Sequence, residues 1–201
     1  LIKNRSVKGN LLTNHSINRV EFKTQGISTL SGKKIWFDES INRINDDERG
    51  DYLGEFASND KILTISSSGY YELLSYDLSN HFPDDMVLLE KYNASKAIVV
   101  VYFHGQKKQF YIKRFIPEFK NRKVSFIDDS NGSYLELCTS DVNTHLKLEF
   151  IKPRNRDVKE DQIVNPLEFI SIKGISTLGN QLSRHPIKSI SLIEVDKNDK
   201  P

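Results

Sequence analysis

Residues 96–116 read KAIVVVYFHGQKKQFYIKRFI, and this stretch decides the class of the fold. Ala97–Phe103 is an apolar run rich in β-branched and aromatic side chains, which favour strands. The polar residues His104–Lys107 follow, and apolar and polar side chains then alternate over 110–115. Two such runs joined by a short polar segment that contains glycine predict a β-hairpin.

The same pattern recurs on both sides of this stretch. Residues 60–78, DKILTISSSGYYELLSYDL, predict a second hairpin that turns at Ser67–Gly69, and residues 133–153, SYLELCTSDVNTHLKLEFIKP, predict a third around Asp141–Asn143. Helix signals are weak, with one short helical turn expected within 84–93. Shorter strands are expected at 11–13, 19–23, 34–38, 123–128, 168–172 and 189–195.

Two phrases occur twice in the chain. KGNLLTNHSINRVEF at 8–22 is echoed by LGNQLSRHPIKSISL at 178–192, and GISTL at 26–30 recurs letter for letter at 174–178. Successive hairpins with polar turns are typical of a barrel, a sandwich or propeller-like blades. Repeated phrases favour blades, because each blade buries its faces against similar neighbours. The expected fold class is therefore all-β.

Composition sets limits on the class of protein. The chain has 201 residues, of which 37% are hydrophobic and 28% charged, and this length suits one large domain or two small ones. A single cysteine excludes a disulfide framework and favours a reducing compartment. No stretch approaches the roughly 20 apolar residues of a membrane span. The chain starts without Met inside an expected strand, which indicates a piece of a longer protein.

The formal net charge of +2 hides a block pattern. Residues 3–34 and 104–123 each carry seven basic residues against one acid, whereas residues 38–60 carry eight acids against two arginines. Such blocks place one sign of charge on one part of a folded surface, which a net sum does not reveal.

The stretch KNRSVKG at 3–9 resembles a degraded gyrase-A box, a motif that usually reads QRRGGKG. Arg5, Lys8 and Gly9 keep the pattern. The order of phrases GISTL, KKIWFD, ERGDYLGEF, NDKILTISSSG, LEKYNASKAIVVVYFHG, YIKRF and EFISIKGISTLGNQL is similar to the C-terminal domain of the topoisomerase IV A subunit of Bacteroides-type bacteria, in the gyrase A and topoisomerase IV A family. This resemblance runs through nearly the whole chain.

The resemblance implies a β-pinwheel, in which four-stranded blades exchange strands, with about four blades or an open partial ring. Residues 1–201 would form one such domain, with a first blade segment and the degenerate box at 1–30, middle blades at 31–170 and a closing repeat at 171–195. The implied partners are double-stranded DNA, the remainder of the A subunit and the B subunit, in the bacterial cytoplasm at the nucleoid and without a membrane.

The resemblance also places the chemistry outside this chain. None of the eight tyrosines follows an arginine, so the Arg-Tyr pair of the family's cleavage site is missing. The fragment is expected to be no enzyme on its own and to hold no cofactor or metal, while the parent enzyme uses ATP and Mg²⁺. The degraded box favours decatenation or relaxation over DNA wrapping.

Phosphate contacts need positive charge within reach, and the basic blocks supply it. The residues expected to bind DNA are Lys3, Arg5, Lys8, Lys33, Lys34, Lys107, Lys108, Arg114, Lys120, Arg122, Lys173, Arg184 and Lys188. Adjacent residues of a strand point to opposite faces, so only one of Lys113 and Arg114 is expected to face DNA.

Other interpretations stay open at the level of sequence. The box residues also suit an ordinary solvated turn, and lysines at a hairpin tip also serve solubility or protect an exposed strand edge. The histidines lack metal-binding spacing, and Asp128–Gly132 lacks the spacing of a calcium loop. Cys138 and Trp36 are expected to be packing residues, the latter between blades. The alternative function is a protein-interaction propeller that docks a partner or the catalytic core without touching DNA.

Overall fold

The computed structural model describes residues 15–17, 32–128, 130–151 and 160–194. The chain divides into two units, Leu1–Ser31 and Gly32–Pro201. Only His15–Ile17 of the first unit are described, and they form no strand. The strands expected at 11–13 and 19–23 and the first copy of GISTL lie outside the described residues.

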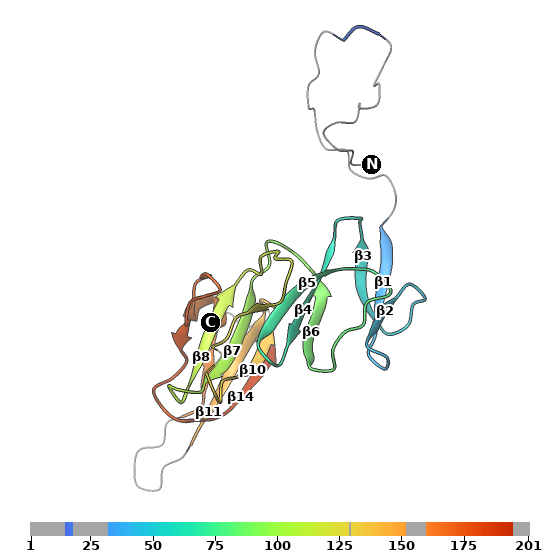
Figure 1. Cartoon of the computed structure of the whole chain (residues 1–201). Helices are drawn as coiled ribbons and strands as arrows, with labels where there is room; N and C mark the ends of the chain where they lie inside the picture. The colour runs from blue at the N-terminus through green and yellow to red at the C-terminus, as the bar shows by residue number, and fades with distance from the viewer. Residues whose placement is uncertain (1–14, 18–31, 129, 152–159, 195–201) are drawn as a thin grey trace. The chain divides into compact units, whose positions relative to one another are not determined.

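The described part of the second unit is all-β, apart from one short helix, and forms four small antiparallel sheets (Figure 1). The first sheet has the order β2-β1-β3, from β1 (Lys33–Asp38), β2 (Arg43–Asn45) and β3 (Asp51–Phe56). The second has the order β6-β4-β5-β9, from β4 (Lys61–Ser66), β5 (Tyr70–Ser75), β6 (Met86–Lys91) and β9 (Val124–Ser125).

The third sheet has the order β10-β7-β8-β13, from β7 (Ile98–His104), β8 (Gln109–Phe115), β10 (Tyr134–Thr139) and β13 (Asn180–Gln181). The fourth has the order β12-β11-β14, from β11 (Thr144–Phe150), β12 (Gln162–Val164) and β14 (Ile187–Glu194). The helix α1 (Pro166–Phe169) begins at Asn165, whose side chain accepts a hydrogen bond from the backbone N–H of Leu167.

The hairpins predicted at 60–78 and 96–116 are confirmed as β4–β5 and β7–β8. The strands expected at 34–38 and 189–195 are confirmed as β1 and β14, and the one at 123–128 is limited to β9. The hydrophobic alternation and the polar turns that predicted these elements are local signals, and local pairing follows from them directly.

Neighbouring sheets exchange strands. The strand β9 follows the β7–β8 hairpin along the chain but pairs with β5 of the second sheet. In the same way β13 follows β12 but pairs with β8 of the third sheet. The first two sheets are joined by a shorter exchange of the same kind, in which His81, between β5 and β6, forms a single β-bridge with Arg43 of β2. This wiring is consistent with a β-pinwheel.

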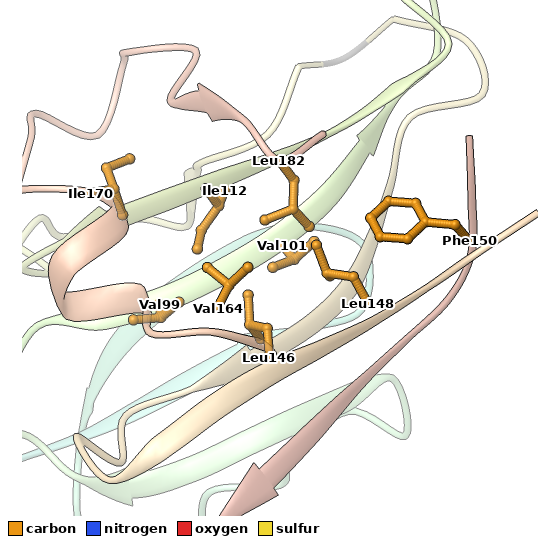
Figure 2. Close-up of a cluster of buried hydrophobic side chains, with 9 residues drawn as sticks. All are labelled: Val99, Val101, Ile112, Leu146, Leu148, Phe150, Val164, Ile170 and Leu182. Carbon is orange, nitrogen blue, oxygen red and sulfur yellow. The ribbon is translucent and has the colours of Figure 1, made fainter. Parts of the chain in front are cut away.

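Each interval between successive sheets holds its own hydrophobic cluster. Val99 and Val101 of β7 face the fourth sheet and meet Leu146 and Leu148 of β11 (Figure 2). The alternate residues Ile98 and Val100 pack toward the second sheet. Because both faces of β7 are buried, its sequence is an unbroken apolar run rather than an alternating one.

Four sequence-based expectations are wrong. The strands of 133–153 form no hairpin, because β10 pairs with β7 whereas β11 pairs with β12 and β14. Alternation of apolar and polar residues shows which face of a strand is buried, but it does not show which other strand pairs with it. Residues 84–93 hold β6 rather than a helical turn, and 168–172 hold the end of α1 rather than a strand. Within the described sheets Trp36 does not pack between two of them: it lies opposite the buried side of β1, with its ring 5.1 Å from that of Tyr52.

Candidate nucleic-acid interface

The tip of the β7–β8 hairpin carries the exposed side chains of Lys107 and Lys108. The backbone N–H of Lys108 donates a hydrogen bond of 2.8 Å to the carbonyl of His104, which closes the turn. Lys108 adopts a φ of 54°, in the left-handed region that such a tight turn requires. Neither lysine forms an ion pair with any described residue, so both ammonium groups are available to an anion.

The adjacent residues Lys113 and Arg114 of β8 point to different faces. Lys113 is only 6% exposed, and its ammonium group donates hydrogen bonds to the carbonyl oxygens of Phe126 and Ile175. Burial lowers the pKa of Lys113 to about 8. Arg114 is half-buried and lines a surface pocket of about 270 Å³. Of the two, Arg114 is therefore the residue that reaches the surface.

The segments that lead to the exchanged strands carry further basic residues. Residues 117–123, which lead to β9, include the exposed Arg122 and Lys123. Residues 171–179, which lead to β13, include Lys173, and Arg184 follows that strand. The ammonium group of Lys173 donates a 2.8 Å hydrogen bond to the amide oxygen of Asn180, a neutral partner that leaves its charge uncompensated.

The equivalent segment that leads to the edge of the first sheet is acidic. Residues 77–85 contain Asp77, Asp84 and Asp85 but no lysine or arginine. The crossover segments therefore bring cations to the outer edges of the second and third sheets, whereas at the first sheet the exposed Arg43 belongs to the edge strand β2 itself.

Three of the expected DNA-binding lysines already have carboxylate partners. The shortest nitrogen–oxygen distance is 2.7 Å for Lys33 with Asp46, 3.7 Å for Lys188 with Glu149 and 3.9 Å for Lys120 with Glu118. The hydrogen bond from Lys33 holds the pKa of Asp46 below its usual value. These pairs are exposed and individually weak, but each carboxylate competes with an incoming phosphate.

The remaining expected residues fall into two groups. Lys34 is exposed on β1, opposite Glu55 of β3, without an ion pair to the described residues. Lys3, Arg5 and Lys8 lie outside the described residues. The structure thus brings Lys108 and Arg184 together around one pocket and separates both from Lys33 and Lys34 of the first sheet.

A sequence model of a known domain family matches residues 43–194, more than half of the chain, and this family is described as the topoisomerase C-terminal domain of Bacteroidota. The chain belongs to this family. A search of curated proteins finds no match. The protein is therefore a domain of a bacterial topoisomerase.

Three further features of this topoisomerase domain concern metal ligands, its cysteine and membrane helices. Within them, no three residues of the types His, Cys, Asp or Glu gather as a metal site. Burial raises the pKa of Cys138 to about 12, so its thiol is a poor nucleophile near neutral pH. Of the described residues, none belongs to a helix long and apolar enough to cross a membrane.

One feature of the topoisomerase domain, an aromatic pair beside the hairpin tip, was missed at the level of sequence. Phe103 and Phe110 line the pocket that Lys108 and Arg184 share. The predicted hairpin could have revealed this pair, because strands that fold back around the turn at His104–Lys107 place Phe103 opposite Phe110. Arg184 approaches this pocket because β13 pairs with β8; the resemblance implies strand exchange between blades but does not identify which residues it brings together.

Proposed function

We propose that this chain is the DNA-binding and DNA-bending accessory domain of a type IIA topoisomerase A subunit, of the topoisomerase IV or gyrase kind. It steers the DNA segment that the catalytic part of the enzyme captures for decatenation or relaxation. It works in the bacterial cytoplasm beside the rest of the A subunit and the B subunit. Family membership supports the assignment to a topoisomerase, and the distribution of unpaired cations supports the DNA-binding role.

The observation that carries this proposal is the set of uncompensated cations on the third sheet and its crossovers. Lys107 and Lys108 at the hairpin tip, Lys173 and Arg184 all lack a carboxylate partner among the described residues. Arg122 adds a fifth such charge at the outer edge of the second sheet. Each contact of this kind binds phosphate and releases counterions without reading bases.

Bending follows from contacts on two successive sheets. A duplex that contacts the edge of the third sheet and Arg122 and Lys123 at the second spans two successive sheets, and we expect it to bend toward the protein to hold both contacts. The cost of bending falls on the DNA and depends on its deformability. We therefore expect preference for flexible or already curved DNA rather than for a base sequence.

The degraded box at 3–9 bears on which reaction the parent enzyme performs. Its departures from the full motif favour a decatenating or relaxing enzyme over one that wraps DNA tightly. These residues lie outside the described ranges. Their contribution is tested by exchanging Lys3, Arg5 and Lys8 for glutamine and measuring the affinity for duplex DNA.

The deciding experiment measures duplex binding by the full chain at two salt concentrations, together with energy transfer between dyes at the two DNA ends. We expect affinity to fall steeply as salt rises and the ends to approach each other on binding. Affinity that does not change with salt, or DNA ends that stay apart in the complex, contradicts the proposal.

One observation favours a second candidate, docking of a protein such as the catalytic core. Val142, Leu167 and Ile172 line the pocket that Arg114 also lines, and their exposed fractions are 57%, 38% and 47%. Exposed apolar side chains that gather around one pocket are typical of protein contacts. Exchange of Val142 and Ile172 for serine would then weaken association with the catalytic core and leave duplex affinity unchanged.

A further inference from the structure

A pocket of about 200 Å³ lies between the β7–β8 hairpin tip and the segment 183–187 that leads into β14. Pockets for drug-sized ligands usually measure about 300–1,000 Å³, so this one suits a single small group. Its lining combines cations with aromatic rings and contains no acidic residue. The other described pocket that a basic residue shares with aromatic rings, Lys123 with Tyr70 and Tyr71, has Glu72 in its lining.

The cationic side of the pocket consists of Lys108 and Arg184, with His185 beside them. Lys108 and Arg184 form no ion pair with a described residue. Two uncompensated cations that converge on a small space, without a carboxylate in its lining, favour an anionic ligand. A phosphate group satisfies both.

The aromatic side of the pocket consists of Phe103 and Phe110, whose ring centroids lie 5.2 Å apart. Phe103 also stacks on Tyr134, at 5.3 Å between centroids, and Tyr134 is 45% exposed. The three rings occupy neighbouring strands β8, β7 and β10 of one sheet. They form a hydrophobic surface on which a planar ring can stack, which a phosphate alone does not need.

Backbone hydrogen bonds hold the segment 183–187, which forms one side of the pocket. The N–H of Leu182 donates to the carbonyl of Phe110 at 2.9 Å, and the N–H of Ile151 donates to the carbonyl of Pro186 at 3.0 Å. These bonds tie the segment 183–187 to the third and fourth sheets. The backbone of this side of the pocket is therefore in place before any ligand arrives, which reduces the ordering cost of binding.

We infer that this pocket binds one unpaired nucleotide of a DNA chain, with its base against Phe103 and Phe110 and its phosphate at Lys108 and Arg184. A base within a duplex is stacked between its neighbours and cannot enter such a pocket. The inference rests on the proposed DNA-binding function and deepens it. A domain with this pocket favours underwound DNA, in which bases are more often unpaired.

The test compares an intact duplex with the same duplex carrying a central bubble of mismatched thymines. The two probes have equal length and equal phosphate number, so the sequence-independent electrostatic contribution is matched. We expect the full chain to bind the bubble about tenfold more tightly. Phe110→Leu and Phe103→Leu keep an apolar side chain, and each should remove this preference while affinity for the intact duplex stays within about twofold.

A second measurement does not depend on the folding of any variant. Photo-crosslinking of the unaltered chain to a halogenated uracil inside the bubble should attach the base to peptides containing 103–110 or Tyr134. Equal affinity for both probes, a preference that both leucine variants retain, or crosslinks only elsewhere would overturn the inference while intact-duplex binding upholds the proposed function. Loss of binding to every DNA probe would instead overturn both.

Discussion

The ammonium group of Lys113 donates a hydrogen bond of 3.0 Å to the backbone carbonyl of Ile175. The same group donates to the carbonyl of Phe126, directly after β9, whereas Ile175 precedes β13. One buried lysine on β8 therefore holds the segments of both exchanged strands. Its position explains why a basic residue stands between the buried aromatic residues Tyr111 and Phe115 on the same face of β8.

Burial of Lys113 makes stability depend on pH in the alkaline range. Its pKa falls to about 8 in the folded state, below an unfolded value of about 10.4, so between these values the unfolded chain binds more protons. Stability carried by this group therefore rises as pH increases from about 8 to about 10. The measurement is the free energy of unfolding in denaturant at several pH values.

Lys113→Met lacks the titrating group and supplies the reference. The difference between the two proteins in free energy of unfolding should grow with pH in favour of the unaltered chain, by at most about 3 kcal/mol. Subtracting one free energy of unfolding from the other cancels the contribution of the tyrosines and other lysines that titrate in both proteins. A difference that stays flat or shrinks as pH rises contradicts the burial of a titrating ammonium.

Charge reversal separates the free cations from the paired ones. Lys107→Glu with Lys108→Glu should weaken binding to any duplex sequence about tenfold at low salt, and the salt slope should fall by about two. Lys33→Glu with Lys188→Glu makes the same change in net charge where carboxylates already stand, and should cost at most about threefold. Fluorescence anisotropy with labelled duplexes gives both numbers, and equal losses would mean that only net charge matters.

Gly179 fixes the entry of the exchanged strand β13. Its φ is +85°, and a Cβ atom there would lie 2.2 Å from the carbonyl oxygen of Ile112. Gly179→Ala should lower the free energy of unfolding by about 2–4 kcal/mol, because both the backbone conformation and the contact oppose it.

Gly174 in the same segment is the matched control for this substitution. A Cβ atom on Gly174 would meet nothing within 4 Å, so Gly174→Ala should change stability by no more than about 0.5 kcal/mol. Thermal unfolding of the two variants settles the comparison. Similar losses in both would show that the β13 edge is not the sensitive feature.

Tyr71 anchors the basic segment that leads to β9. Its hydroxyl donates to the carbonyl of Glu118 at 3.0 Å and accepts from the Glu118 N–H at 3.1 Å, and burial raises its pKa. Tyr71→Phe leaves both backbone groups without this partner and should cost about 1–2 kcal/mol. The neighbouring Tyr70→Phe should cost little, because the Tyr70 hydroxyl bonds to none of the described residues. Denaturant midpoints of the two variants check this, and a larger loss in Tyr70→Phe would contradict it.

Local elements of this fold were predictable from the sequence, and long-range pairing was not. The hairpins around Ser67–Gly69 and His104–Lys107 were found because turn and strands are contiguous. The link at Asp141–Asn143 looks similar in sequence but joins two different sheets, because alternation says nothing about which strand lies alongside.

The candidate site shows the same division. Strand alternation predicted that only one of Lys113 and Arg114 faces outward, which the burial of Lys113 confirms. The partner of Lys188 is Glu149, a residue on another strand that nothing local identifies. Which lysines are free is therefore a property of the tertiary structure, and the DNA-binding role of each remains a prediction.

The strand exchange has a consequence for how such a domain can grow or shrink during evolution. A duplicated segment that matched the borders of the second or third sheet would arrive without its outer strand, because β9 and β13 are encoded beyond the next hairpin. To add a complete sheet, the duplicated segment of sequence must extend past the next hairpin, so that it includes the exchanged outer strand. Gain or loss of a blade in this lineage therefore has to rewire two neighbouring sheets at once.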